Sequence, residues 1–192
     1  MSLLTVVIPV RNGGSPDITT RSLERQTFKD FDVVVQHDEG NGANWARNKG
    51  AANVTTKYIL FSDDDIRWNP RSMECLVRAM EENPGCDFAY GSYEMDGVLQ
   101  CDKPFDAAAL RKQNYISTMS IIRTDKFPLF DEGIKRLQDW DLFLSLVENG
   151  SSGVYIGRVI FSTEKGDGIT YGEDGVPYEE AIMAVRTKHG IA

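Results

Sequence analysis

The sequence is poor in cysteine and has no long apolar run. Its three cysteines are an odd number and do not follow Cys-x-x-Cys spacing, which argues against both a disulfide framework and a cysteine-ligated zinc site. No apolar stretch approaches the roughly 18 residues that a membrane-spanning helix needs. The N-terminus opens directly into a strand-like run, without the features of a signal peptide. We therefore expect free thiols, no transmembrane segment and a cytoplasmic protein.

Basic residues are also scarce relative to acidic ones. The chain has 21 Lys and Arg against 29 Asp and Glu, which gives a formal net charge of −8. This balance argues against a protein that neutralises nucleic-acid phosphates over a broad surface, so we expect no nucleic-acid partner. A polyanionic ligand would instead need a local positive charge, such as a bound metal ion. A chain of 192 residues is long enough for one α/β domain with a sizeable core, and we expect one domain over residues 1–192.

Apolar runs of strand length alternate with helical patterns in the first third of the chain, and each run ends in a polar or glycine-rich segment. Strands that alternate with helices form parallel βαβ units, and the carboxyl ends of such strands meet at one edge of the sheet. We therefore predict that the three loops meet at a ligand crevice. The predicted buried strands are Leu3–Val10, Phe31–Val35 and Tyr58–Phe61. The first predicted helix has Asp17 as its N-cap and Ile18, Leu23 and Phe28 on its buried side. The second predicted helix follows Gly42.

The remaining patterns predict helices and further strands. Met73, Leu76, Val77 and Met80 recur at the spacing of a helix that faces a core. The predicted order is a helix that starts at Asn69-Pro70, a strand Asp87–Met95, a turn at Asp96-Gly97 with a return strand Val98–Cys101, a helix Phe105–Lys112, a strand Tyr115–Arg123, a helix around Leu137–Leu144, a strand Val154–Phe161, a glycine-rich loop Gly166–Gly175 and a helix Tyr178–Lys188. The segment Glu164–Gly175 is either a lid that orders over bound donor or a loose loop.

Three consecutive aspartates follow the third strand. In an extended segment, residues two apart point to the same side, so Asp63 and Asp65 can converge while Asp64 faces away. Each of the two would raise the pKa of the other unless a cation lies between them. Mg²⁺ or Mn²⁺ suits such carboxylates together with substrate phosphates. The pattern predicts a metal-bridged phosphate ligand; the other reading is that the aspartates only end a strand and solvate a loop.

A second acidic feature lies in Leu137-Gln138-Asp139-Trp140-Asp141. Trp140, Phe143 and Leu144 share one helical face, which predicts a packed helix. Asp139 and Asp141 are then about 200° apart around the axis and cannot both face one substrate. Asp141 is expected to be solvated or locally paired.

Four motifs in order resemble the family 2 glycosyltransferases, which have the GT-A fold. They are TVVIPVRN near the start, G-x-x-x-A-R-N-x-G over Gly42–Gly50, FSDDD at the end of the third strand, and the late QDWDLFLSL. The resemblance covers residues 4 to about 160. It implies an α/β fold of GT-A type, with a mostly parallel central sheet flanked by helices. Residues 1–95 would bind the nucleotide-sugar, and residues 96–192 would form an acceptor-side half with a small antiparallel extension and a C-terminal loop and helix.

The resemblance also implies an activity and a set of site residues. A nucleotide-diphospho-sugar would donate its sugar to an acceptor hydroxyl on an unidentified glycan, lipid-linked or protein acceptor. Mn²⁺ or Mg²⁺ would stabilise the leaving diphosphate, and a carboxylate that acts directly as base implies inversion. The implied residues are Val10, Arg11, Asn12, Asp38, Arg47, Asp63 and Asp64 for donor binding, Asp65 and Asp63 for the metal, and Asp139 as catalytic base.

Three positions depart from the family pattern. The second strand ends in Gln36-His37-Asp38 where paired aspartates are usual, and Gln138 stands where an acidic residue is common. Relatives often offer a C-terminal histidine as third metal ligand, and in the corresponding region Glu164 is at best a substitute. Two alternatives stay open. A nucleotidyltransferase would usually carry a glycine-rich phosphate loop with a lysine after the first strand, and a catalytically degenerate module would bind nucleotide-sugar or glycan without turnover.

Overall fold

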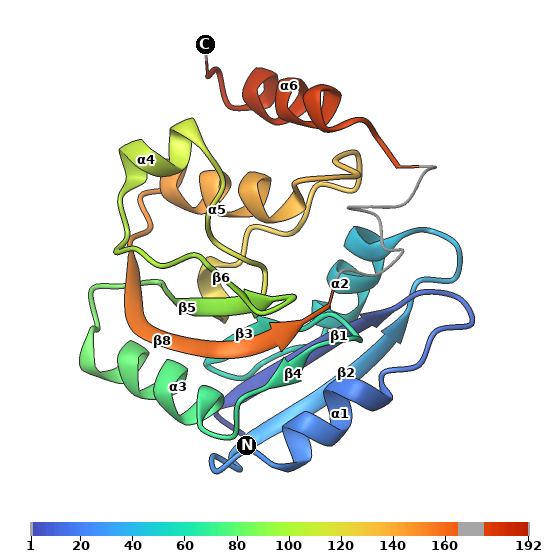
Figure 1. Ribbon diagram of the computed structural model, residues 1–192, viewed down its shortest axis with the longest axis vertical. Coiled ribbons are helices and arrows are strands. Elements are labelled where there is room, and N and C mark those ends of the chain that lie inside the picture. The colour runs from blue at the N-terminus through green and yellow to red at the C-terminus, as the bar shows by residue number, and fades with distance from the viewer. Residues whose placement is uncertain (1, 165–174, 192) are drawn as a thin grey trace.

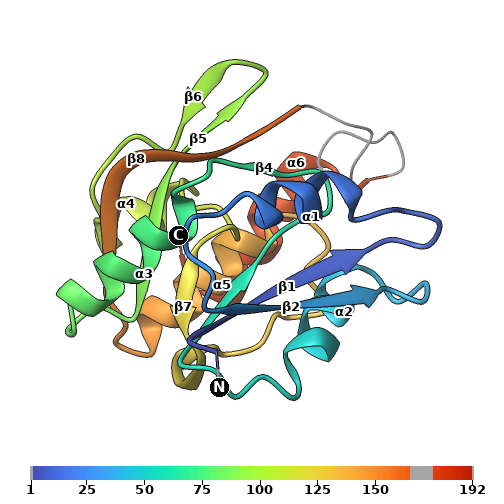
Figure 2. The ribbon, with the colours of Figure 1, turned by 90° about the horizontal axis from the view of Figure 1, so that it is seen from below.

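The computed structural model of the chain describes residues 2–164 and 175–191. In this part of the chain, eight strands form one sheet in the order β2-β1-β3-β7-β5-β8-β4, with β6 paired to β5 (Figures 1 and 2). The strands are β1 Leu4–Val10, β2 Phe31–His37, β3 Tyr58–Phe61, β4 Arg67–Trp68, β5 Phe88–Met95, β6 Val98–Gln100, β7 Ile121–Arg123 and β8 Gly153–Thr163. The helices are α1 Asp17–Glu24, α2 Ala43–Ala51, α3 Ser72–Glu82, α4 Ala107–Lys112, a 3₁₀ turn Thr124–Lys126, α5 Gln138–Glu148 and α6 Tyr178–Lys188.

The first three strands form the predicted parallel unit. β1 pairs in parallel with both β2 and β3, and every residue of β1 is buried because helices cover both of its faces. α2 lies so close to β1 that a Cβ added at Gly50 would stand 2.6 Å from Val7. The glycine therefore allows the helix that carries Arg47 to lie directly on the central strand.

β2 differs from the prediction of a buried strand. It lies at the edge of the sheet, and Val33 and Val35 are each 41% exposed. An edge strand has a neighbour on one side only, so an apolar composition alone does not tell how well its faces are covered.

The second half of the sheet is mostly antiparallel. β3–β7, β7–β5, β5–β6 and β4–β8 are antiparallel pairs, whereas β5–β8 is parallel. The whole sheet is therefore mixed, and its antiparallel part is larger than the small extension that was predicted. The predicted hairpin turn is present: Asp96 and Gly97 have φ of 51° and 75°, as a two-residue turn of type I′ requires. The β5–β6 hairpin projects from the body in Figure 2.

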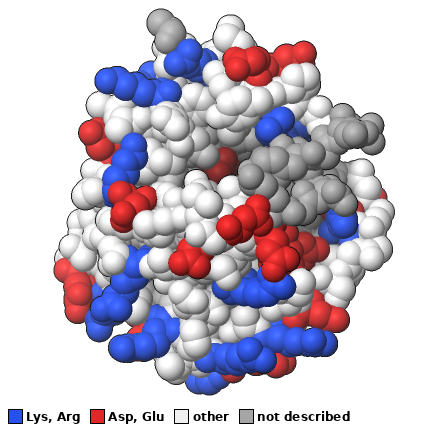
Figure 3. Space-filling view, in the orientation of Figure 1, with Lys and Arg blue, Asp and Glu red and all other residues white. Residues whose placement is uncertain are grey.

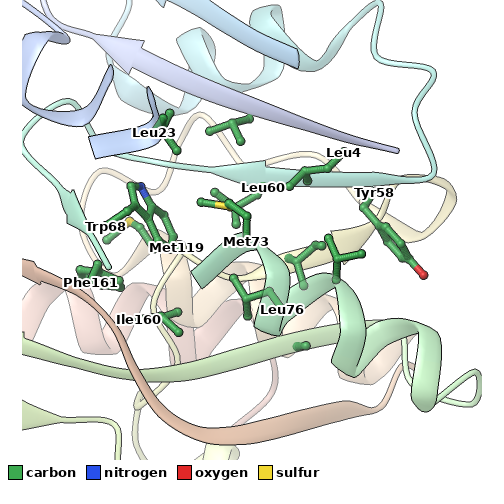
Figure 4. Packing of buried hydrophobic residues seen from close by; sticks show 14 of the residues in the cluster. Leu4, Leu23, Tyr58, Leu60, Trp68, Met73, Leu76, Met119, Ile160 and Phe161 are labelled. Carbon is green, nitrogen blue, oxygen red and sulfur yellow. The ribbon is translucent and has the colours of Figure 1, made fainter. Parts of the chain in front are cut away.

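Two hydrophobic clusters lie on the two faces of the sheet. One cluster contains the predicted helical stripe of α3, Met73, Leu76, Val77 and Met80, together with Trp68 and Phe161 (Figure 4). The other contains Trp140, Phe143 and Leu144 of α5. Figure 1 shows α3 on one side of β5 and β8, and α4, α5 and α6 on the other. The QDWDL segment is thus a core helix, as its periodicity predicts.

Several predicted boundaries were wrong. Asp17 is the first residue of α1 and not its cap, and the buried positions of α1 are Thr19, Ser22 and Leu23, while Ile18 is 42% exposed. α3 begins at Ser72, two residues beyond the predicted start. Asn69 does not cap α3; its side chain donates to the carbonyl of Val159 at 2.8 Å. Within Tyr115–Arg123, only the last three residues form a strand.

Three remaining predictions concern the whole chain. The three cysteines are free thiols. Among the described residues, no helix is long and apolar enough to cross a bilayer. The candidate lid Glu164–Gly175 lies outside the described residues except for its two end residues.

Candidate active site

The loops that follow β1 and β2 are joined through Asp38. The backbone N–H of Asn12 and that of Gly40 both donate to Asp38 Oδ1, each at 3.1 Å. The N–H of Asp38 in turn donates to the carbonyl of Val10 at 2.8 Å. Three of the predicted donor-binding positions are therefore brought together at the carboxyl ends of the first two strands.

The loop after β1 also reaches the aspartate motif. A Cβ added at Gly14 would stand 3.2 Å from Asp64 Oδ2. The pKa of Asp64 is raised by burial and by the charge of Asp63, while the charge of Arg11 opposes that shift. Asp64 therefore faces the first loop and Arg11, and all three loops meet as predicted.

Arg47 forms a buried ion pair with the first aspartate of the motif. Its Nη2 lies 2.8 Å from Asp63 Oδ1, and its side chain is only 6% exposed. Nη1 donates to Asn44 Oδ1 at 3.0 Å, and the guanidinium lies 5.2 Å from the centre of the Phe130 ring. Its buried Nε has no hydrogen-bond partner in the described part of the chain. The charge of Arg47 is thus paired with Asp63, and its guanidinium is shielded from water.

Two asparagines of α2 fix the helix that carries Arg47 to the segment 130–134. Asn44 donates to the carbonyls of Asp131 and Ile134 at 2.7 and 3.0 Å. Asn48 donates to the carbonyl of Phe130 at 2.9 Å and accepts from its N–H at 2.8 Å. These residues lie three and four positions apart, on one face of the helix. The sequence analysis missed the role of Asn44, although its spacing from Arg47 was a usable signal.

Asp65 is exposed, and its pKa is raised by its surroundings. Desolvation by neighbouring protein and the charges of Asp63 and Asp64 raise the pKa of Asp65 to about 6. Among the described residues, no three His, Cys, Asp or Glu side chains are arranged as a metal site, and Asp63 is paired with Arg47. The protein would therefore contribute one or two carboxylates. That donor set fits Mg²⁺ or Mn²⁺ in a site completed by ligand phosphates, and a cation there would relieve the repulsion.

Glu164 is not gathered with these aspartates by any described contact. Its carboxylate lies 3.3 Å from Arg67 Nη1, and both side chains are exposed. Acidic side chains gather near the centre of the face shown in Figure 3, where the surface is hollowed. The prediction that Glu164 substitutes for a third metal ligand is not tested by this arrangement.

Asp139 lies in the first turn of α5. The N–H of Trp140 donates to its Oδ1 at 2.9 Å, and the Asn114 side chain is a second hydrogen-bond partner. Burial raises the pKa of Asp139, while Asn114, the Trp140 N–H and the charge of Arg47 oppose this shift. Arg47 therefore acts electrostatically on both Asp63 and Asp139. Nothing in the local sequence identified Asn114, because its contact with Asp139 depends on the tertiary fold.

Asp141 faces away from Asp139, as the helical geometry predicts. It is buried, with His189 Nε2 at 2.9 Å and Lys188 Nζ at 2.8 Å from its Oδ1. His189 Nδ1 lies 2.8 Å from Glu148 Oε2. The expectation of a solvated carboxylate was wrong and that of a paired one was right. The pairing fixes the end of α6 to α5.

Comparisons with known proteins agree with these motifs. Residues 5–125 match the family model described as Glycosyl transferase family 2. A Haemophilus influenzae protein named "Uncharacterized glycosyltransferase" is 24% identical over 190 residues, covering 80% of this chain and 65% of that protein. A Haloferax volcanii protein named "Glucosyl-dolichyl phosphate glucuronosyltransferase" is 36% identical over 75 residues, covering 38% of this chain and 24% of that protein.

Solved structures show the same fold. Staphylococcus aureus TarS 1–349 in complex with UDP-GlcNAc has a TM-score of 0.80 at 16% identity, covering 98% of this chain and 66% of that one. TarS 1–349 in complex with UDP has a TM-score of 0.74 at 17% identity, with 98% and 65% coverage. The chain therefore spans less than two thirds of the length of these proteins, and its fold is the GT-A fold of glycosyltransferases.

Proposed function

The chain belongs to glycosyl transferase family 2, and we propose that it transfers a sugar from a nucleotide-diphospho-sugar to an acceptor hydroxyl, with a divalent cation and with inversion at the sugar carbon. The observation that supports this most strongly is the position of Arg47. One buried guanidinium pairs with Asp63 of the aspartate motif and also acts on Asp139. The same guanidinium thus interacts with a residue predicted to bind the donor and with the predicted base.

The joined loops would hold the nucleoside. Asp38 uses Oδ1 for both of its backbone contacts. Among the described residues no backbone N–H donates to its Oδ2, which could therefore accept a hydrogen bond from a ribose hydroxyl. Arg11 and Asn12 are exposed beside it and would contact the base, whereas Val10 is fully buried and would support this loop from below. Asp64 faces the same loop. We propose a nucleotide-binding half over residues 1–95 and an acceptor-side half over residues 96–192, in one domain.

The aspartates would hold the cation. Asp65, with Asp63 beside it, would supply carboxylate oxygens, and the diphosphate would supply others. The negative charge that develops on the leaving nucleoside diphosphate would be offset by a divalent ion held there. Asp65 is the better ligand of the two because Asp63 is engaged by Arg47.

Asp139 would act as the base. A carboxyl with a raised pKa is a stronger base than an ordinary aspartate, provided that it remains ionised at the working pH. Burial raises the pKa, while Arg47 and Asn114 limit the rise. Asp139 would accept the proton of the acceptor hydroxyl as that oxygen attacks the sugar carbon from the side opposite the departing diphosphate, which inverts the configuration. No covalent sugar–enzyme intermediate is needed.

The donor class follows from the comparisons by analogy. TarS, which shares the fold, has been solved with UDP-GlcNAc, so UDP-sugars are the first donors to test. The acceptor in our proposal is a hydroxyl on a glycan, a lipid-linked saccharide or a protein. We place the reaction in the cytoplasm because the three cysteines are free thiols, as a reducing compartment favours.

Product analysis tests this proposal against its alternatives. The protein is incubated with UDP-GlcNAc and Mn²⁺, and separately with UTP, GlcNAc 1-phosphate and Mg²⁺. A transferase releases UDP from the first mixture even without acceptor, as slow hydrolysis. Release of pyrophosphate from the second mixture would establish a nucleotidyltransferase instead, and tight UDP binding without any release would establish a degenerate module.

Matched variants connect the result to the site. Asp139→Asn is expected to keep UDP binding and lose turnover by at least about a hundredfold, the scale of general-base catalysis. Asp125→Asn removes an exposed carboxylate of the 3₁₀ turn and is expected to keep full turnover. Equal activity of the two variants would exclude Asp139 as the base.

A further inference from the structure

A groove between α3 and β8 is not used by the proposed reaction. Two adjoining cavities of about 330 and 200 Å³ lie along it, and both are lined by Cys75 and Arg158. None of the residues that line them belongs to the donor, metal or base positions. The two cavities together make one extended groove at the surface.

Three arginines line this groove. Arg71 lines the first cavity, Arg78 lines the second, and Arg158 lines both. The carboxylate of Glu82 is the one acidic group that lines either cavity in the described residues. The local balance is therefore positive on a protein whose overall charge is −8.

Arg158 lies in a β-bulge of β8. Tyr90 pairs with Tyr155 and Ser92 with Val159, so Gly91 alone lies opposite the extra β8 residues, Arg158 among them. Within the bulge, Gly157 has a φ of 61°. A β-bulge of this kind re-aims a side chain out of the regular sheet pattern.

The close packing of β5 against this bulge fixes it. A Cβ added at Gly91 would stand 2.6 Å from the carbonyl oxygen of Arg158. The two glycines, Gly91 and Gly157, therefore allow a strand geometry that most residues would not permit. Such a geometry keeps Arg158 at the junction of the two cavities.

No acidic side chain of the described residues pairs with Arg158. Its side chain makes no hydrogen bond or ion pair within residues 2–164 and 175–191. Arg71 pairs with Glu74 at 3.1 Å and Arg78 with Glu82 at 3.9 Å, and these arginines are 63% and 50% exposed. An exposed, long pair adds little stability, so the Arg78–Glu82 pair can give way to a better anion. Arg71 is held by two hydrogen bonds to Glu74 and would share its guanidinium between Glu74 and a ligand.

From these observations we propose that the α3–β8 groove, with Arg71, Arg78 and Arg158, binds an extended ligand that carries phosphate groups. One carboxylate satisfies one guanidinium, as Glu74 does for Arg71. A phosphate group has several oxygen atoms and can accept hydrogen bonds from more than one guanidinium at once. Three arginines along adjoining cavities thus suit a ligand with several phosphates in a row.

Calorimetric titration with inorganic tripolyphosphate tests this site. The titration is done on Asp65→Ala in metal-free buffer at fixed ionic strength, so that the proposed donor site does not contribute. Arg158→Gln is expected to weaken binding about tenfold, the effect of losing one charge-assisted contact. Arg25→Gln removes an exposed arginine at the end of α1 and is expected to change the affinity by less than twofold.

The possible outcomes decide the proposal. No binding to the Asp65→Ala protein, unchanged affinity in Arg158→Gln, or equal weakening by Arg25→Gln would overturn it. A parallel titration with propane-1,2,3-tricarboxylate distinguishes phosphate from carboxylate, and equal affinity for the two anions would overturn the assignment to phosphate. Arg158 is exposed, so its replacement is not expected to disturb folding. The result does not depend on whether the chain transfers sugars.

Discussion

Replacement of Arg47 by methionine tests whether its ion pair joins α2 to the end of β3. The side chain is 6% exposed and makes two hydrogen bonds, to Asp63 at 2.8 Å and to Asn44 at 3.0 Å. Hydrogen bonds to charged groups contribute about 1.5–3 kcal/mol each. Asp63 is 38% exposed and can regain water, which favours the lower value. We therefore expect the free energy of unfolding to fall by about 3 kcal/mol.

Urea denaturation followed by tryptophan fluorescence measures this loss, and Lys57→Met is the matched control. The Lys57–Glu81 pair has a similar N–O distance of 2.7 Å, but its side chains are 45% and 44% exposed. An exposed pair contributes about 0–1 kcal/mol. A loss below about 0.5 kcal/mol for Arg47→Met, or a loss equal to that of the control, would refute the account of Arg47 as a buried structural cation.

Three further predictions concern Asp139, α6 and β8. Asp139→Asn should raise the melting temperature at neutral pH, because burial raises the pKa of Asp139 and ionisation of this aspartate therefore favours the unfolded chain. Below about pH 4 the aspartate is protonated in both states, so the gain should vanish. A gain that stays constant down to pH 3 would contradict this. His189→Ala leaves Asp141 without one buried partner and should increase amide exchange in α6. Unchanged exchange would argue against the His189–Asp141 pair as the contact that fixes α6 to α5. Gly153→Ala puts a Cβ 2.1 Å from Phe88 and should lower stability by about 1–3 kcal/mol in urea, whereas wild-type stability would show that the Phe88 ring moves freely.

The fold was predictable where local patterns act over a long segment. The continuous apolar run of β1, the helical stripe of α3 and the limits of α6 were all readable from spacing. β2 was predicted as buried because its composition resembles that of β1, yet its position at the sheet edge is set by strand order. Strand order depends on contacts between distant segments, which local periodicity does not encode.

The site was predictable for residues that lie in motifs. Asp63 and Arg47 were found from their motifs, although their direct pairing was not foreseen. Asn114 carried no signal, since it meets Asp139 only through the packing of the loop after α4 against α5. The partners of Asp141 lie 47 and 48 residues further along the chain, so its burial could not be inferred from the helix alone.

The central claim is that the loops after β1, β2 and β3 bind a nucleotide diphosphate together with a cation on Asp65. Thermal unfolding with UDP, with Mn²⁺ and with both tests it most directly, because a ligand that binds the native state raises the melting temperature by mass action. The account predicts a rise that needs both UDP and Mn²⁺, disappears in Asp65→Ala and persists in Asp139→Asn. A rise with UDP that is independent of Mn²⁺ and retained in Asp65→Ala would contradict it.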